Sequence, residues 1–453
     1  MNKLINILII VCISLFEGNA QCWKQLAGGS YFSAAIKVDG SLWSWGINLN
    51  GELGDGTNIG KLTPNQIGID NNWRSISCGT AHNVAIKNDS TLWGWGHNLY
   101  GQLGNGANIN LNIPTKIGID DDWQTVAAGF YHTLALKTDG SLWSVGFNQY
   151  GQLGDGTTVH KNIAIQIGVG SVWKFIAVGA HHCFAIKSDG TLWAWGQNQY
   201  GQLGDGTNNP KLFPVQVGSD NDWKSIACGT QTVALKTNGS LWSWGQNQYG
   251  QLGDGTNVNK NIPTMISNES GWLAVDCGDT YTLALKIDGS LWAWGRNHYG
   301  TLGDGTNVNK SIPTQIGTDT DWKKLSTPIT HSQLIKNDGT LWVTGLNDLG
   351  QLGDGTTVDK NILTQIGCWP TAVEQVTKIN FKMNYHQRQL SFDNQSIYLL
   401  EAKLFDILGR QVQQFEIQRG ISRSDIGIYA QGIYFVNVYK KGNIIKSEKI
   451  FID

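Results

Sequence analysis

The chain has 453 residues, a formal net charge of -2 and a sequence pI near 6.5. Nucleic-acid-binding domains carry a basic surface, so this balance excludes a nucleic-acid partner from our expectations. Only 15% of the residues are charged, whereas Gly occurs 57 times and Trp 20 times. Many glycines among short apolar runs are typical of turn-rich β structure and argue against a helical protein.

The first twenty residues differ from the rest of the chain. A short basic start precedes an apolar run from Leu4 to Phe16, and small residues follow as far as Ala20. This pattern predicts a secretory signal peptide over residues 1–20. A membrane anchor is the alternative, but a spanning helix needs about twenty apolar residues. A lipid on Cys22 is disfavoured because no small residue precedes it. We expect no membrane span in the mature chain.

Tryptophan marks an internal repeat. Self-similarity at one period predicts a repeat array. Units of 49 or 50 residues, such as WQTVAAGFYHTLALKTDGSLWSVGFNQYGQLGDGTTVHKNIAIQIG, open at Trp23, Trp73, Trp123, Trp173, Trp223, Trp272 and Trp322. Short alternating runs in each unit predict strands, and an Asp-Gly pair between two of them predicts a two-residue hairpin turn. Four short strands make one propeller blade, so seven units predict a closed seven-bladed ring.

The other tryptophans also recur at fixed positions of the repeat. Seven belong to a Leu-Trp pair, five precede the Gly that ends that run, and Trp369 stands where an eighth unit would begin. This phasing predicts packing within and between blades. Stacking of some indoles on a sugar is the alternative.

Three segments recur in order: G-x-x-H-x-x-A-L, D-G-x-L-W-x-W-G and N-x-x-G-Q-L-G-x-G. They resemble the regulator of chromosome condensation repeat family, from about Trp23 to Gly367. The resemblance implies a seven-bladed β-propeller, in agreement with the count of units. We therefore expect the propeller to occupy residues 22–368.

Two cysteines flank the repeats. Cys22 directly precedes the first repeat tryptophan, and Cys368 directly follows the seventh unit. The matching positions at the junction of the first two units are Asn72 and Ile69, which lie in one loop. Ring closure should therefore make the two cysteines neighbours, and an oxidising destination would allow a Cys22–Cys368 disulfide. Two free thiols are the alternative.

After Trp369 the period stops and glycine thins out. We expect a linker over residues 369–374 and a small antiparallel β-sandwich over residues 375–453, because alternating apolar strands follow one another there. The whole chain is thus predicted to be all-β: a seven-bladed β-propeller followed by a small antiparallel β-sandwich.

The C-terminal segment carries a second resemblance. Its residues LFDILGR from Leu404, GIYFV from Gly432, and then Lys446 and Lys449 resemble the C-terminal sorting domain of type IX secretion cargo. The resemblance implies contact with the secretion machinery and export through the periplasm to the outer cell surface or the medium. A small stabilising β domain is the alternative.

The residue types that could serve in catalysis recur at fixed positions of the repeat. Phe32 and Tyr281 occupy the same repeat position as four histidines, so we interpret these as structural: His82, His132, His182 and His331. Three cysteines also share one position and are interpreted as core residues, without metal-ligand spacing: Cys78, Cys228 and Cys277. The Asp of the Gly-Asp-Gly loops is interpreted as a turn residue, with calcium binding as the alternative. We predict no catalytic residue, no metal and no cofactor.

Two polar residues are present in every unit. The asparagines are predicted to satisfy backbone groups in the long loop: Asn48, Asn98, Asn148, Asn198, Asn247, Asn297 and Asn347. The lysines are predicted to be solvated, with a cationic ring for an anionic partner as the alternative: Lys37, Lys87, Lys137, Lys187, Lys236, Lys286 and Lys336.

The sequence favours a secreted or surface binding protein that uses one loop face of the ring. Aromatic, His and Arg side chains are common at interfaces. The candidate interface residues are Tyr31, Tyr100, Phe130, Tyr131, Tyr150, His181, Tyr200, Tyr249, Arg296, His298 and Tyr299. We expect a monomer whose partner is a protein or a surface glycan. The alternatives are guanine-nucleotide exchange, as in the family's nuclear member, and an enzyme acting on polysaccharide.

Overall fold

The structure is a computed structural model that describes residues 23–267, 270–367, 381–386, 389–394, 400–406, 410–426, 429–440 and 443–452. The chain divides into two compact units, Met1–Trp369 and Pro370–Asp453. The predicted signal peptide and linker lie outside the described residues, as do both cysteines of the predicted disulfide, Cys22 and Cys368.

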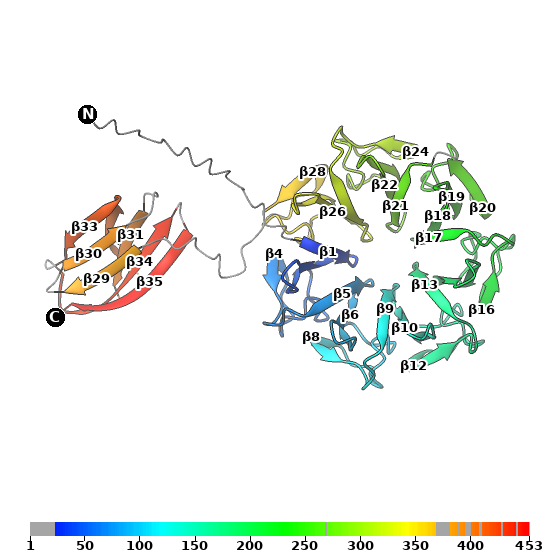
Figure 1. The fold of residues 1–453 in the computed structure, drawn as a ribbon, viewed down its shortest axis with the longest axis horizontal. Helices are drawn as coiled ribbons and strands as arrows, with labels where there is room; N and C mark the ends of the chain where they lie inside the picture. The colour runs from blue at the N-terminus through cyan, green and yellow to red at the C-terminus, as the bar shows by residue number, and fades with distance from the viewer. Residues whose placement is uncertain are drawn as a thin grey trace, which may run out of the picture. The chain divides into compact units, whose positions relative to one another are not determined.

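The first unit contains seven four-stranded antiparallel sheets arranged in a ring (Figure 1). Each sheet is one blade, and its strands follow in chain order from the centre outwards. The innermost strands open at the repeat tryptophan: β1 (Trp23–Gly28), β5 (Trp73–Cys78), β9 (Trp123–Ala128), β13 (Trp173–Val178), β17 (Trp223–Cys228), β21 (Trp272–Cys277) and β25 (Trp322–Ser326). The second strands end at the repeat lysine: β2 (Phe32–Lys37), β6 (His82–Lys87), β10 (His132–Lys137), β14 (His182–Lys187), β18 (Gln231–Lys236), β22 (Tyr281–Lys286) and β26 (His331–Lys336).

The third strands carry the Leu-Trp pair: β3 (Leu42–Gly46), β7 (Leu92–Gly96), β11 (Leu142–Gly146), β15 (Leu192–Gly196), β19 (Leu241–Gly245), β23 (Leu291–Gly295) and β27 (Leu341–Gly345). The outermost strands are β4 (Lys61–Gln66), β8 (Leu111–Lys116), β12 (Lys161–Ile167), β16 (Lys211–Gln216), β20 (Lys260–Ser267), β24 (Lys310–Gln315) and β28 (Lys360–Ile366). The predicted seven-bladed β-propeller is confirmed.

The turn between the second and third strands is longer than the predicted two-residue hairpin. In blade 1 the amide of Lys37 donates to the carbonyl of Ser41 at 3.0 Å, so three residues span the turn. Only the last of them has a positive φ, 84° at Gly40. A three-residue connection needs one left-handed position, whereas a two-residue type I′ turn needs two. The Asp-Gly motif therefore supplies a single left-handed residue.

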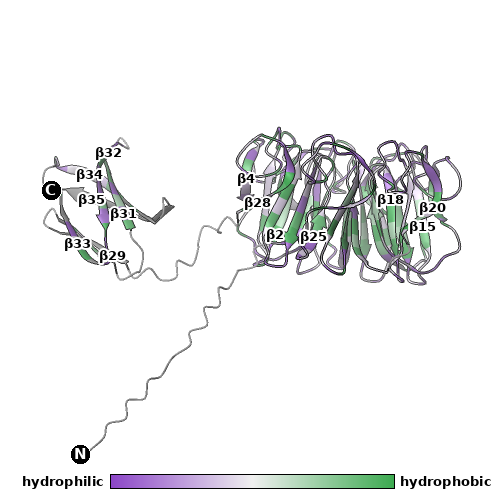
Figure 2. Cartoon of the chain, turned by 90° about the horizontal axis from the view of Figure 1, so that it is seen from above, coloured by the Kyte–Doolittle hydropathy of each residue, from purple (hydrophilic) through white to green (hydrophobic). Residues whose placement is uncertain are grey.

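Hydrophobic clusters hold neighbouring blades together. Each of the seven clusters in the propeller contains residues of two adjacent blades. The repeat tryptophan packs edge-on against the Leu-Trp ring of its own blade, with ring centroids 6.1 Å apart for Trp173 and Trp193. Figure 2 shows hydrophobic residues along the strands and hydrophilic residues in the loops at both ends of the propeller. The predicted packing role of the tryptophans is confirmed.

Blades 1 and 7 close the ring through contacts between described residues. The indole of Trp45 donates to the carbonyl of Gln351 at 2.9 Å, and the hydroxyl of Ser33 donates to the same carbonyl at 2.7 Å. One hydrophobic cluster contains residues of both blades. Closure therefore uses the same kind of contact that joins the other blades, and the Cys22–Cys368 disulfide stays a prediction.

The prediction that the repeat lysines are solvated is wrong. Lys37 is 5% exposed and Lys87 is 6% exposed. The ammonium of Lys87 lies 4.7 Å from the ring centroid of Trp73 and 3.8 Å from that of Trp93, and it pairs with Asp70 at 2.6 Å. The same contact between a lysine and two indoles recurs in every blade. Because cation–π attraction strengthens on desolvation, these lysines stabilise the blades and do not form an open cationic ring.

The second unit contains two antiparallel sheets. One has the order β29–β30–β33, formed by β29 (Phe381–His386), β30 (Gln389–Asn394) and β33 (Gly420–Asp425). The other has the order β32–β31–β34–β35, formed by β31 (Leu400–Asp406), β32 (Gln411–Ile417), β34 (Gly432–Lys440) and β35 (Asn443–Ile452). Both sheets bury apolar residues in one core: Leu390, Phe392, Leu400, Ala402, Leu404, Tyr434, Val436 and Val438. The predicted small β-sandwich is confirmed.

Candidate interaction face

The predicted interface residues lie in two kinds of loop. One is the short turn between the first and second strands of a blade, and the other is the long loop between its third and fourth strands. In an antiparallel meander both connections lie at the same end of the blade. In blade 3 the amide of Phe147, in the long loop, donates to the carbonyl of Tyr131, in the short turn, at 2.9 Å. We call this end of the propeller the loop face.

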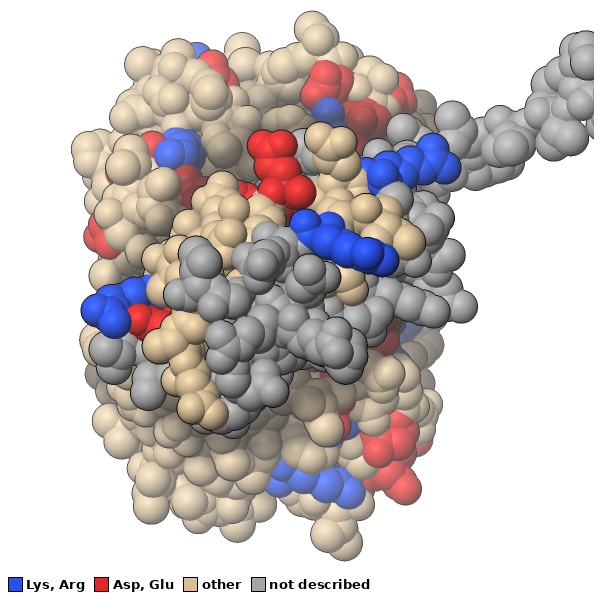
Figure 3. All heavy atoms as spheres, turned by 90° about the vertical axis from the view of Figure 1, so that its left-hand side faces the viewer, with Lys and Arg blue, Asp and Glu red and all other residues tan. Residues whose placement is uncertain are grey.

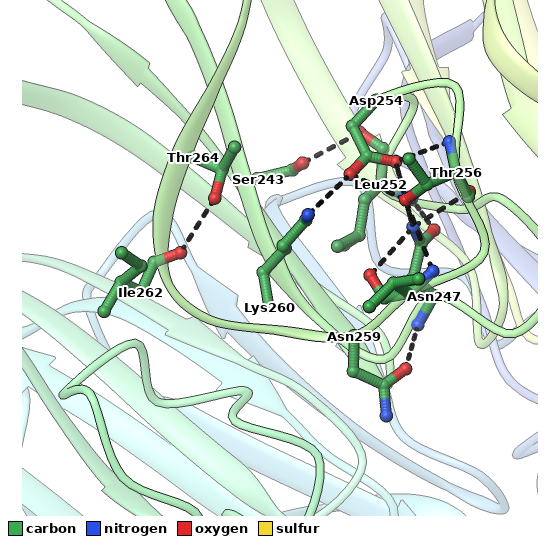
Figure 4. Close-up of polar contacts among 10 residues, drawn as sticks. Ser243, Asn247, Leu252, Asp254, Thr256, Asn259, Lys260, Ile262 and Thr264 are labelled. Atoms are coloured by element: carbon green, nitrogen blue, oxygen red, sulfur yellow. Dashed lines mark hydrogen bonds and ion pairs between the residues drawn. The ribbon is translucent and has the colours of Figure 1, made fainter.

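Each long loop is held by an asparagine network, which Figure 4 shows for blade 5. The side-chain oxygen of Asn247 accepts from the amide of Leu252 at 3.0 Å. Its side-chain nitrogen donates to the carboxylate of Asp254 and to the carbonyl of Thr256, both at 3.0 Å. Asp254 also lies 3.5 Å from the ammonium of Lys260. The predicted roles of the asparagines in satisfying backbone groups and of the aspartates as turn residues are confirmed.

The carboxylates of the Gly-Asp-Gly loops accept hydrogen bonds from neighbouring protein groups and pair with a lysine, as Asp254 does. Burial by itself would raise the pKa of Asp254, but hydrogen bonds from Thr256 and Asn247 together with Lys260 lower it. Asn105 takes this position in blade 2 and accepts the corresponding hydrogen bonds with a neutral amide. Within the part of the chain that the structure describes, no group of three His, Cys, Asp or Glu residues is arranged to hold a metal ion.

Eight rings gather on the loop face over blades 2 to 4, and we call them the aromatic patch. Its members are His97, Tyr100, Phe130, Tyr131, Phe147, Tyr150, His160 and His181. The ring centroid of Phe147 lies 5.0 Å from Tyr100, 4.7 Å from His160 and 5.7 Å from His181. His160 is exposed, and the other rings are half-buried. Contacts of this kind stabilise ring pairs by about 0.5–1.5 kcal/mol each, so the patch is preformed.

Burial shifts the pKa values of three titratable rings of the patch toward their neutral forms. Burial lowers the pKa of His181 to about 4. Burial also lowers the pKa of His97, although the charge of Glu52 opposes the shift. Burial raises the pKa of Tyr131. These rings are therefore uncharged near pH 7. In Figure 3 the visible Lys, Arg, Asp and Glu side chains stand in small separate groups.

A smaller polar group lies over blades 5 and 6 of the loop face. The guanidinium of Arg296 stands 5.0 Å from the ring centroid of Tyr249. The rings of His298 and Tyr299 lie 4.7 Å apart. Arg296, His298 and Tyr299 border a hollow of about 70 Å³ together with Asp279. Burial raises the pKa of Asp279, while Arg296 opposes this shift.

The structure groups the eleven predicted interface positions in three ways. Five join the aromatic patch: Tyr100, Phe130, Tyr131, Tyr150 and His181. Four form the polar group: Tyr249, Arg296, His298 and Tyr299. Tyr31, which is 38% exposed, and the half-buried Tyr200 lie on the same face outside both.

Sequence reasoning missed three members of the patch, His97, Phe147 and His160. A signal for the first two was present, because the residue after the Trp-Gly step varies from unit to unit where its neighbours repeat. In chain order it is Ile47, His97, Phe147, Gln197, Gln246, Arg296 and Leu346. The variation at this loop position would have pointed to His97 and Phe147, which residue type alone did not.

The central channel contains a cavity of about 260 Å³. Asp276 stands in its wall where other blades have Ala or Ser, and its carboxylate accepts from the amide of Thr327 at 2.9 Å. Burial raises the pKa of Asp276 to about 6. Burial also raises the pKa of the free thiols of Cys78, Cys228 and Cys277. These thiols are therefore protonated. Cys277 is buried as expected for a core residue, whereas Cys78 and Cys228 are half-buried in the cavity wall.

The four repeat histidines are also buried, each with 0% exposure: His82, His132, His182 and His331. Their rings reach the next blade, as in the 3.2 Å contact between the His82 imidazole and the Thr133 hydroxyl. Burial lowers the pKa of each. The interpretation of these histidines as structural residues is confirmed.

The comparison with protein families decides what the propeller is. Residues 11–273, more than half of the chain, match the RCC1-like domain. The chain belongs to the RCC1-like domain family. Residues 272–301 and 288–332 match the regulator of chromosome condensation (RCC1) repeat. The first resemblance drawn from the sequence is thus confirmed. No curated protein matches the chain.

Solved structures agree with the RCC1-type fold. Human WBSCR16 is 24% identical, with a TM-score of 0.64 over 72% of this chain and 94% of that chain. Prp20p from Saccharomyces cerevisiae is 20% identical, with a TM-score of 0.65 over 81% of this chain and 90% of that chain. Yeast RCC1 (Prp20) bound to Kap60 is 19% identical, with a TM-score of 0.64 over 81% of this chain and 87% of that chain. These likenesses show the fold.

The second unit has a family of its own. Residues 369–453 match the secretion system C-terminal sorting domain, which confirms the second resemblance. This domain implies contact with the secretion machinery and export to the cell surface or the extracellular space. The described residues contain no helix that is long and apolar enough to cross a membrane.

Proposed function

We propose that this RCC1 propeller is an exported binding protein that holds a partner on the aromatic patch of its loop face. The patch is the observation that carries the proposal. Aromatic side chains are enriched in the cores of protein interfaces and among the residues whose loss weakens binding most. A protein is the partner that this surface fits best. A surface glycan is the second candidate, because rings such as Tyr100 and Tyr150 could also stack on sugars.

The backbone under the patch supports its rings before any partner binds. The amides of Tyr100 and Tyr150 donate to the side chains of Gln102 and Gln152, at 3.1 Å and 2.9 Å. The amide of Phe130 donates to a carbonyl of the neighbouring blade at 3.3 Å. Immobilising a side chain on binding costs about 0.5–1.5 kcal/mol. A preformed patch avoids much of this loss, and tight binding then needs little rearrangement.

We propose that the C-terminal unit serves delivery and the propeller serves binding. The predicted signal peptide over residues 1–20 would lead the chain into the periplasm, and residues 370–453 would then be recognised for passage across the outer membrane. The match to a sorting domain supports this division. The separate hydrophobic core of this unit supports it as well, because that core contains no propeller residue.

We propose no enzymatic activity. The repeat histidines are buried, and the repeat cysteines are buried or half-buried. Burial shifts their pKa values toward the neutral forms, so they do not offer a charged surface nucleophile or base. Guanine-nucleotide exchange and polysaccharide cleavage find no specific support in the geometry of the loop face. Binding without turnover is the function that this face favours.

A double variant of the patch tests the proposal. Immobilised mature chain is incubated with spent culture medium and with the cell-surface fraction, and the affinity of the retained component is measured by calorimetry. Truncating a residue that dominates an interface costs about 2 kcal/mol or more, roughly a 30-fold loss. We expect Tyr100→Ala with Tyr150→Ala to weaken retention at least that much. Ile69→Ala with Ile119→Ala is the matched control, because these side chains are 94% and 91% exposed in loops at the opposite end.

The same experiment separates the two partner classes. Protease treatment of the fraction should abolish retention of a protein, and periodate treatment should abolish retention of a glycan. A partner that stays bound to the patch variant but not to the control variant would place the binding face at the other end of the propeller and contradict the proposal.

A further inference from the structure

In five blades the tryptophan of the Trp-Gly step fills a slot against the preceding blade. These indoles are fully buried: Trp45, Trp95, Trp195, Trp244 and Trp294. The slot is bordered by a loop glycine of the preceding blade, since a Cβ added to Gly154 would lie 2.9 Å from the indole nitrogen of Trp195. That nitrogen donates to the carbonyl of Gln152 at 2.9 Å. The slot therefore has a flat apolar shape. In four of the five blades it also offers a carbonyl to the indole N–H, whereas the N–H of Trp294 has no hydrogen-bond partner among the described residues.

Blade 7 lacks this tryptophan but fills its slot in another way. Thr344 takes the position of the indole. Leu363 stands in the outer strand where five other blades have proline. A Cβ added to Gly303 would lie 3.1 Å from Leu363 and 3.3 Å from Thr344, so both side chains reach the slot. The leucine replaces volume that the missing indole would have occupied.

Blade 3 lacks both the indole and the leucine. Val145 takes the tryptophan position and Ala164 takes the position of Leu363. The slot between blades 2 and 3 is left as a cavity of about 230 Å³. Apolar side chains form most of its wall, among them Leu92, Leu103, Ile117 and Val145. Ile163, which is 65% exposed, belongs to the same wall, so the cavity opens at the outer rim of the propeller.

Among the described residues, the slot carbonyl of blade 3 accepts one hydrogen bond fewer than its counterpart in blade 4. In the filled slot of blade 4 the carbonyl of Gln152 accepts from both Trp195 and Cys183. In blade 3 the corresponding carbonyl, that of Gln102, accepts from the hydroxyl of Thr133 at 2.9 Å. A carbonyl oxygen has two lone pairs. In the part of the chain that the structure describes, no indole N–H donates to this carbonyl, which belongs to the residue before the wall residue Leu103 and is not itself part of the cavity wall.

We propose that the cavity between blades 2 and 3 binds a free, neutral, planar aromatic molecule of about the size of indole. The shape argument is internal to the protein, because five sister slots hold that ring. An apolar cavity of about 150 Å³ suffices for benzene, and drug-sized ligands need about 300–1,000 Å³. The observed volume lies between these limits. This site is separate from the aromatic patch and does not depend on it.

Titration of the mature chain with indole, followed by calorimetry, tests the site. We expect saturable binding of one indole per chain and a melting temperature that rises with indole concentration. Absence of saturable indole binding to the wild-type chain would overturn the proposal.

Two variants locate the binding. Val145→Trp restores the indole of the five filled slots, and Ala164→Leu copies the solution of blade 7. Each should raise the melting temperature without ligand and weaken indole binding at least tenfold. The second variant keeps the test decisive if the first does not fold. Unchanged indole affinity in a folded filled variant would show that indole binds elsewhere and would refute the assignment.

Discussion

The indole of Trp195 allows a measurement of how much a filled slot stabilises the ring. Trp195→Val copies blade 3 in blade 4. The side chain is 0% exposed, and its nitrogen donates to Gln152 at 2.9 Å. Truncating a buried tryptophan to alanine costs about 3–5 kcal/mol. The two methyl groups that valine keeps restore about 0.8 kcal/mol each, and the lost hydrogen bond adds about 1 kcal/mol. We expect the free energy of unfolding to fall by about 3 kcal/mol.

Urea unfolding followed by tryptophan fluorescence is the assay. All 20 tryptophans lie between Trp23 and Trp369, so the signal reports the propeller and not the C-terminal sheets. A second variant supplies the internal control. Trp195→Val combined with Pro214→Leu reproduces the arrangement of Leu363 in blade 7 and should recover about 1–2 kcal/mol, because a leucine side chain returns to the slot.

A fall of less than about 1 kcal/mol would refute the reasoning. It would mean that the strands around Trp195 close over the smaller side chain, and that the slot has no shape of its own. The same result would weaken the case for the open cavity beside Val145. Failure of the leucine to restore stability would show that the slot in blade 7 is filled by something other than Leu363.

Three further predictions concern acid stability and the domain boundary. Burial lowers the pKa of His82 from 6.5 to about 3, so the unfolded chain binds more protons between these values. The free energy of unfolding should fall as the pH drops from 6.5 toward 3, by up to about 1.4 kcal/mol per pH unit. The variant His82→Phe, which copies Phe32, should make the midpoint of urea unfolding depend less on pH between pH 7 and 4. The lowered pKa of Asp254 gives stability above pH 3.8 that is lost on further acidification. The variant Asp254→Asn, which copies Asn105, should therefore be slightly less stable at pH 7 and lose less stability between pH 4 and 2. For each of these two variants, a pH dependence of stability equal to that of the wild-type chain would contradict the role given to the replaced residue. Deleting residues 370–453 should leave the calorimetric melting temperature of the propeller within about 2 °C and keep the protein in the periplasm, whereas normal export of the truncated chain would refute the sorting role.

The repeat sequence is sufficient to predict the number and construction of the blades. A tryptophan every 49 or 50 residues and a Leu-Trp pair in every unit define strands whose partners lie within the same unit. Such contacts are local, so the pattern of one unit already contains the order of its strands. The register at the Asp-Gly turn was not predicted, because that turn has three residues and not two. The boundary near Trp369 is equally visible, because the period and the glycine content end there together. The loop face could be predicted as well, since the two loops that form it alternate regularly with the strands.

The contacts between blades were decided by the tertiary structure. Within a blade the same holds for Lys87, which looks like a surface residue in its own strand. Trp73 and Trp93 of its own blade and Asp70 of the loop before that blade enclose it once the blade has folded. The aromatic patch takes its rings from three blades, so no single unit contains its pattern. The cavity of blade 3 depends on Val145 and on a glycine loop one blade away. Closure of the ring brings residues about fifty positions apart into van der Waals contact, and side-chain volume at those contacts determines which slots are full. A repeat pattern gives the type of residue at each position, but packing across the blade boundary decides what that residue does.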